Sequence, residues 1–147
     1  MGLTTDIIVG FPGETEEDFQ ETLAVVREVQ FDNAYCFKYS QRKDTPAAAM
    51  PDQLSEEVIE ERHARLLNLV NEIGAKRYLE YVGRTEQILV LGPSRRNAAT
   101  LEGRTRNNRI VIFEGDQRHI GQLMDVKIER SGLFTLYGDP AIINLDE

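Results

Sequence analysis

The sequence of 147 residues has a single cysteine, Cys36, and no long apolar run. One thiol excludes an internal disulfide, and it excludes any metal or iron–sulfur site in this chain that needs several thiolates. No stretch approaches the roughly 18 to 20 consecutive apolar residues of a membrane-spanning helix, and no basic segment precedes an apolar one at the start. We therefore expect a cytoplasmic protein without a metal site of its own. Apolar residues make up 41% of the chain, which is enough for the core of one domain or of two small ones.

Positive charge is scarce and unevenly distributed, and the formal net charge is -8. Residues 1–80 hold 16 acidic and 8 basic side chains, whereas residues 81–147 hold 9 of each. Within the second half, residues 84–118 contain seven arginines and four acids. This asymmetry indicates two regions with different electrostatic tasks.

The first part of the chain has the pattern of a strand, a helix and a second strand. Residues 5–10 carry consecutive apolar side chains, typical of a parallel strand covered on both faces. Thr15, with Asp18 as its capping-box partner, predicts a helix to about residue 30, and residues 34–39 read as the second strand. One crossover helix cannot cover both faces of such a pair. Either another chain completes this portion, or the sequence is the C-terminal piece of something larger.

The rest of the pattern predicts a long helix followed by a small β-domain. Ser55 is expected to cap a helix that reaches about residue 80. Alternation places Met124, Val126 and Ile128 on one face of a strand. Five short strands, separated by turn signals, fit a small closed barrel of the oligonucleotide-binding kind. They are expected near residues 84–91, 100–105, 109–113, 123–129 and 133–137.

Two loops follow the predicted parallel strands, at the edge where α/β folds bind ligands. The first, residues 10–15, offers glycines and free N–H groups, but the helix start carries four acids that would repel a phosphate, so a neutral or cationic ligand fits better. These acids are Glu14, Glu16, Glu17 and Asp18. A structural turn with acids placed for the helix dipole is the alternative, and spacing alone favours it. The second loop, residues 39–47, is compatible with substrate contact or with an ordinary connection.

Arg104, Arg106 and Arg109 lie within six residues, at a strand end and its turn. Guanidinium groups pair with phosphates and stack on unpaired bases, so we favour RNA contact over a solubilising turn. Arg84, Arg95 and Arg96 are weaker candidates in the same domain.

The remaining reactive side chains predict no catalytic group. Cys36 lies within a strand among aromatic neighbours, as a small buried hydrophobic residue would. Neither histidine has metal-ligand spacing with a partner. We expect His63 to be a solvated surface residue, and His119 to be an RNA contact or a loop residue.

Three segments in order resemble the tRNA methylthiotransferases of the MiaB type, which are radical S-adenosylmethionine (SAM) enzymes. They are residues 5–15, residues 37–47 and residues 103–113. The resemblance implies an α+β fold in several parts. Residues 1–50 would be the end of a radical-SAM partial TIM barrel and residues 51–82 a linking helix. Residues 83–140 would be a TRAM domain, an OB-like RNA-binding barrel, and residues 141–147 a tail.

The resemblance also implies an activity for the whole enzyme, which adds a methylthio group at C2 of N6-isopentenyladenosine beside the tRNA anticodon. The family uses SAM and two [4Fe–4S] clusters, but the cluster cysteines are absent from this sequence. We therefore expect the chain alone to bind RNA without catalysing the reaction. Its partners would be the tRNA anticodon stem-loop and the missing N-terminal and radical-SAM portions of the same protein, with no membrane.

The resemblance assigns roles to individual residues, none of them catalytic. Part of the SAM pocket would be formed by Gly10, Phe11, Pro12, Gly13 and Glu14. A substrate loop would contain Tyr39, Ser40 and Arg42, and tRNA would contact Arg104, Arg106 and Arg109, with Arg84, Arg95 and Arg96 as weaker candidates. Lys43 and Asp44 stand where the family usually has glycine, but Asp tolerates the left-handed conformation better than most residues.

Two other functions fit the same residues. One is a methylthiotransferase that acts on a ribosomal protein, whose TRAM domain would recognise a protein surface. The other is a stand-alone RNA-binding module with a vestigial α/β half.

Overall fold

The structure is a computed structural model, and it describes residues 1–140. The chain divides into two compact units, one of Leu3–Gly74 and one that begins at Ala75. The predicted tail, residues 141–147, lies outside the described residues. The helices and strands in chain order are β1 (Thr4–Val9), α1 (Glu16–Val29), β2 (Asn33–Lys38), the 3-10 helix η1 (Pro46–Ala49), α2 (Glu56–Leu79), β3 (Thr85–Pro93), β4 (Leu101–Thr105), β5 (Ile110–Phe113), the 3-10 helix η2 (Gln117–His119), β6 (Leu123–Ser131) and β7 (Leu136–Pro140).

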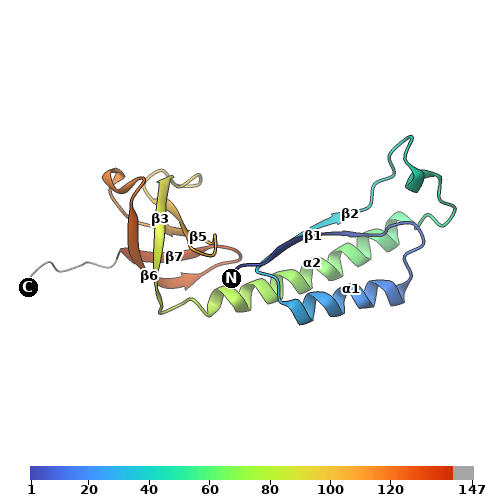
Figure 1. The fold of residues 1–147 in the computed structure, drawn as a ribbon, viewed down its shortest axis with the longest axis horizontal. Helices are drawn as coiled ribbons and strands as arrows, with labels where there is room; N and C mark the ends of the chain where they lie inside the picture. The colour runs from blue at the N-terminus through green and yellow to red at the C-terminus, as the bar shows by residue number, and fades with distance from the viewer. Residues whose placement is uncertain (141–147) are drawn as a thin grey trace, which may run out of the picture. The chain divides into compact units, whose positions relative to one another are not determined.

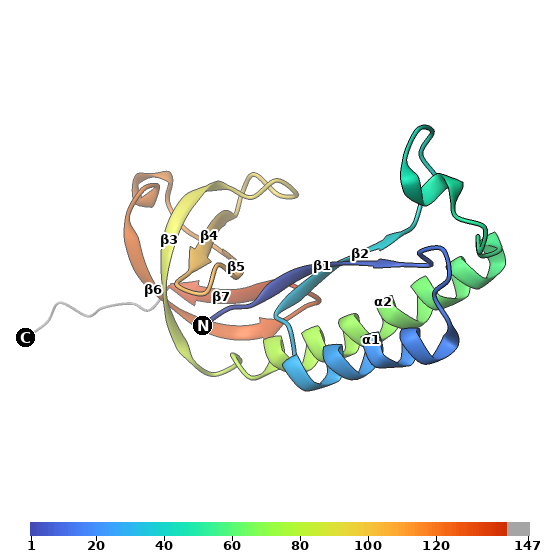
Figure 2. The same cartoon turned by 45° about the vertical axis from the view of Figure 1, so that its right-hand side comes forward.

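The first unit contains the predicted strand–helix–strand arrangement. β1 and β2 pair in parallel, from Thr4 opposite Asn33 onward. The helix α1 begins where the capping box predicts, because Thr15 Oγ1 accepts a hydrogen bond from the Asp18 N–H at 3.1 Å and Asp18 Oδ2 accepts one from the Thr15 N–H at 2.9 Å. Figures 1 and 2 show α1 and α2 running side by side along the β1–β2 pair. The prediction of this unit and of its helix cap is confirmed.

Helices cover only one face of the β1–β2 sheet within the described part of the chain. Val9 and Ala34 are buried, whereas Ile8, Tyr35 and Phe37 are 59%, 57% and 50% exposed. Successive side chains of a strand point to opposite faces, so these three exposed residues mark a bare apolar face. The expectation that β1 is covered on both faces is therefore wrong for this chain. The exposed side chains agree with the argument that one crossover helix cannot cover both faces of the β1–β2 sheet.

The second unit contains a closed barrel with the strand order β3-β4-β5-β7-β6, in which only β5 and β7 pair in parallel. Its core consists of inward-facing strand residues such as Ile88, Val111 and Leu136, together with Tyr78 and Tyr81 from the segment before β3. The prediction of a small five-stranded barrel is confirmed. Val126 and Ile128 are fully buried and Met124 packs against the core, as the alternation predicts.

The last strand begins later than expected, at Leu136 in place of residue 133. Phe134 has a φ of +59°, in the left-handed region, and the Gly132 N–H donates a hydrogen bond to the Thr135 carbonyl at 2.8 Å. A turn therefore occupies the segment that hydrophobicity alone predicts as strand. Further along β7, a Cβ at Gly138 would collide with the carbonyl oxygen of Lys127 in β6, so only glycine permits this close strand pairing.

Candidate functional site

The loop after β1 is a turn in which both glycines have structural roles. Gly10 has a φ of +80°, and a Cβ there would lie 2.6 Å from Cγ1 of Ile59 in α2. Gly13 has a φ of +84°, and its N–H donates to the Asp52 carbonyl at 2.8 Å. Backbone geometry and packing therefore account for the two glycines without a ligand.

The acids of this loop are paired with arginines of α2. Arg62 Nη1 donates to the carboxylate of Glu14 at 2.8 Å and to its backbone carbonyl at 2.9 Å. The two side chains are only 8% and 12% exposed. The Glu14 carboxylate also accepts a bond from the Gly10 N–H at 3.2 Å, so it joins the two ends of the loop.

The neighbouring Glu16 is compensated in the same way. Arg65 Nη2 donates to Glu16 Oε1 at 2.8 Å, and this bond, with a second from Gln20, lowers the pKa of Glu16. Two of the four acids at the start of α1, Glu14 and Glu16, are thus paired with arginines of α2. Sequence reasoning missed Arg62 because it lies 48 positions after Glu14 and carries no motif.

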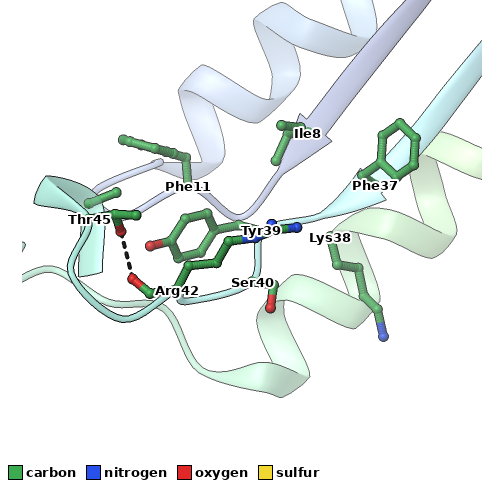
Figure 3. A pocket seen from close by; sticks show the side chains of 9 residues that line it. Ile8, Phe11, Phe37, Lys38, Tyr39, Ser40, Arg42 and Thr45 are labelled. Carbon is green, nitrogen blue, oxygen red and sulfur yellow. Dashed lines mark hydrogen bonds between the residues drawn. The ribbon is translucent and has the colours of Figure 1, made fainter.

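A hollow of about 450 Å³ opens where β1 and β2 end, and Figure 3 shows the side chains around it. Phe11 and Tyr39 meet there edge to face, with their ring centroids 5.4 Å apart. The hollow is lined by Ile8, Phe11, Phe37, Lys38, Tyr39, Ser40, Arg42, Thr45 and Ala47. Tyr39, Ser40 and Arg42, the residues of the predicted substrate loop, all line this hollow. Of the predicted SAM-binding residues, Phe11 lines it.

The substrate loop has the conformation expected of its sequence. Asp44 has a φ of +64°, the left-handed geometry predicted to be tolerated in place of glycine. Thr45 Oγ1 donates to the Arg42 carbonyl at 2.8 Å, the bond drawn in Figure 3, and accepts from the Ala48 N–H at 3.3 Å. Aromatic rings beside a guanidinium and a hydroxyl can hold a flat ligand with a polar edge.

Cys36 and His63 meet across the packing of β2 against α2. Burial raises the pKa of the Cys36 thiol, so the reactive thiolate is disfavoured. His63 is half-buried, and its Nε2 donates to the Cys36 carbonyl at 3.0 Å. The prediction that His63 is a solvated surface residue is therefore wrong, because α2 turns this side chain toward the sheet.

The described part of the chain offers no group of three or more His, Cys, Asp and Glu side chains suited to a metal ion. A [4Fe–4S] cluster needs several thiolates, so the residues present do not fit one. Among residues 1–140, no helix combines the length and the apolar character needed to cross a membrane.

Arg109, predicted to contact RNA, lies inside the barrel. It is 2% exposed, and its guanidinium carbon lies 4.4 Å from the ring centroid of Tyr81 and 5.2 Å from that of Tyr78. A buried cation between two aromatic rings contributes to the core and cannot reach a phosphate on the surface. The assignment of Arg109 to RNA contact is therefore corrected to a structural role.

Arg84 and Arg106 lie on the barrel exterior. The guanidinium of Arg84 lies 5.2 Å from the ring centroid of Tyr81, and Arg106 Nη2 donates to Gln87 Oε1 at 3.0 Å. Both side chains are exposed, so contact with a ligand remains open to them.

Arg95, Arg96 and Arg104 converge on one groove of about 220 Å³, which we call the arginine groove. Arg104 is held in place by a bond from its Nη1 to the Asn108 carbonyl at 3.0 Å. The other lining residues are Ser94, Glu102, Ile110, Ile112, Thr135 and Tyr137. Sequence analysis did not single out three apolar or aromatic side chains of this set, Ile110, Ile112 and Tyr137. A signal for the two isoleucines was present, because the wholly apolar strand β5 must turn every second residue outward.

A closed five-stranded barrel with an arginine-lined groove has the features of a small RNA-binding domain. Residues 79–141 match the TRAM domain family, so the barrel is a TRAM domain.

Over nearly its whole length the chain is similar to proteins named tRNA-2-methylthio-N(6)-dimethylallyladenosine synthase. It is 52% identical to the one from Alkaliphilus oremlandii over 95% of this chain and 30% of the relative. It is 48% identical to the one from Methylacidiphilum infernorum over 100% of this chain and 32% of the relative. The chain spans about a third of the length of these curated relatives.

Proposed function

We propose that the chain is the C-terminal part of a radical-SAM tRNA methylthiotransferase, and that its TRAM barrel binds the tRNA substrate. The whole enzyme would add a methylthio group to C2 of N6-isopentenyladenosine next to the anticodon. The observation that carries the proposal is the arginine groove, because three of the arginines singled out for RNA contact line one groove on a domain of this family. The names of the relatives support the choice of tRNA.

In this proposal residues 1–50 are the end of the partial TIM barrel, residues 51–82 a linking helix and residues 83–140 the RNA-binding domain. The bare apolar face of the β1–β2 sheet supports it, since Ile8 and Phe37 are exposed where the remaining strands of such a barrel would enclose a ligand. The missing portions of the same protein would supply those strands and the cysteines for both [4Fe–4S] clusters.

The hollow at the ends of β1 and β2 would form part of the SAM pocket. SAM carries a flat adenine, and Phe11 and Tyr39 offer aromatic surface to it. The loop conformation that presents Phe11 would depend on Gly10, Pro12, Gly13 and Glu14. The substrate side of the same hollow would be lined by Tyr39, Ser40 and Arg42. The neutral Glu14–Arg62 pair makes this surface suitable for the adenosyl group by shape more than by charge.

The experiment is a filter-binding titration of the 147-residue chain with a tRNA anticodon stem-loop at several salt concentrations. Replacing Arg96 and Arg104, which both line the arginine groove, with Ala should weaken binding and flatten the salt dependence, because each phosphate contact contributes a slope of roughly -0.7 to -0.9. Arg118→Ala combined with Lys127→Ala removes the same two charges from exposed positions of the same domain that do not line the arginine groove, and should change affinity little.

Equal affinity and equal salt slope for the double variant of the arginine groove and the parent chain would overturn the proposal. Competition by a ribosomal protein, with no competition by stem-loops, would instead favour the methylthiotransferase that modifies protein.

A further inference from the structure

The outer face of the barrel carries a second hollow beside the arginine groove. It has a volume of about 240 Å³ and is lined by Thr100, Ile112, Phe113, Glu114, Glu129, Arg130, Tyr137, Gly138 and Asp139. Ile112 and Tyr137 line both hollows, so their side chains form the ridge between them. We call this pair the ridge.

The two hollows have opposite charge. The arginine groove has three arginines and Glu102, whereas the second hollow has three carboxylates and Arg130. A phosphate is therefore attracted to one side of the ridge and repelled from the other. A nucleic-acid backbone on this surface would therefore lie in the arginine groove and not in the second hollow.

The ridge itself is apolar and aromatic. The guanidinium carbon of Arg130 lies 3.7 Å from the ring centroid of Tyr137, a cation–π contact with the ring. In a duplex the bases are stacked inside the helix, and only phosphates and sugars would meet such a ridge. An unpaired base gains by stacking on an aromatic side chain, whatever its identity.

We propose that the ridge binds an unpaired base of the RNA, stacked on Tyr137, while the phosphates beside that base lie in the arginine groove. This inference rests on the proposed function and makes it more specific, because it names a single-stranded segment as the part of the RNA that the barrel recognises.

The test uses two RNAs of equal length and charge, a hairpin with an unpaired loop and a blunt duplex without one. Tyr137→Leu keeps an apolar side chain and removes the aromatic ring, so it should lower affinity for the hairpin about tenfold and leave the duplex unchanged. Tyr137→Phe keeps the ring and should bind both RNAs as the parent does. Tyr35→Leu, the same substitution at an exposed strand residue outside the barrel, serves as the matched control.

A spectroscopic readout keeps the test independent of affinity and of the stability of the leucine variant. The chain has no tryptophan, so Tyr137→Trp introduces a single fluorescent indole at the ridge. The hairpin should quench its emission by stacking, and the duplex should not.

Three outcomes separate the two proposals. Weaker hairpin binding by Tyr137→Leu together with quenching by the hairpin supports the ridge. Equal loss for hairpin and duplex, or binding without quenching, overturns the ridge but leaves RNA binding by the arginine groove in place. An acidic peptide that quenches the indole where the hairpin does not would overturn both, since the face would then bind protein.

Discussion

The pair formed by Glu14 and Arg62 predicts how firmly the loop after β1 is held. Arg62→Met keeps most of the apolar stem and removes the guanidinium, whose carbon lies 5.8 Å from the ring centroid of Phe19. The substitution leaves the Glu14 carboxylate with the Gly10 N–H as its partner and without its cation. A carboxylate that is nearly buried then lacks a counter-charge.

The magnitude follows from the burial of both groups. Removing one member of a buried ion pair costs about 3 to 5 kcal/mol, because the remaining charge stays desolvated. Both side chains keep a little exposure, at 8% and 12%, so the lower figure of about 3 kcal/mol applies. Combining Arg62→Met with Glu14→Gln removes both charges and should recover about half of that loss.

Amide hydrogen exchange measures the effect within the intact chain. Protection of the Gly10 amide and of α1 should fall roughly a hundredfold in Arg62→Met, since each factor of ten corresponds to about 1.4 kcal/mol. The amides of the barrel provide an internal reference. Arg65→Met breaks exposed pairs with Glu16 and Glu61, and should cost at most about 1 kcal/mol. Equal protection in Arg62→Met and Arg65→Met would refute the reasoning.

Three further predictions concern stability. Gly10→Ala should destabilise the first unit by about 3 kcal/mol in urea unfolding, from left-handed strain and overpacking, and Ile59→Ala in the same chain should relieve part of the loss. Arg109→Met should destabilise the barrel by about 2 kcal/mol while the folded protein keeps its RNA affinity; lost affinity without lost stability would restore Arg109 to the RNA site. The pKa of Asp18 is lowered by the backbone hydrogen bond from Thr15 and then by the Thr15 side chain, so its contribution to stability is present above the ordinary value of 3.8 and disappears as pH falls through the lower folded value. Asp18→Asn should remove that part of the acid dependence in pH-titrated unfolding, and an unchanged acid limb would contradict it.

Short-range sequence patterns predict most of the helices and strands. The cap at Thr15 and the alternation through Val126 and Ile128 each depend on residues within a few positions of one another. Such patterns are decided by backbone geometry and by which face is apolar, both of which a sequence displays directly. The start of β7 was misplaced because the left-handed conformation of Phe134 is imposed by the turn and is not favoured by that residue type.

The site residues were harder to predict because their roles depend on distant partners. Arg104 and Arg109 lie five positions apart in one arginine-rich segment, yet one lines a groove and the other is buried between two tyrosines. The difference arises from Tyr78 and Tyr81, which the chain brings from before β3 into the barrel core. His63 was assigned to the surface for the same reason, since only the packing of α2 on β2 reveals its partner.

Net charge was a poor guide to the partner for a physical reason. The acidic excess lies in residues 1–80, but Glu14 and Glu16 form ion pairs there with Arg62 and Arg65, so part of the negative charge that the sequence displays acts inside the first unit. The arginine groove is lined by three arginines and one acid, Glu102, and the charges nearest to a bound phosphate dominate because salt screens those more than about 8 to 10 Å away. A phosphate in the groove therefore responds to the arginines that surround it, and a chain of formal charge -8 can still bind a polyanion.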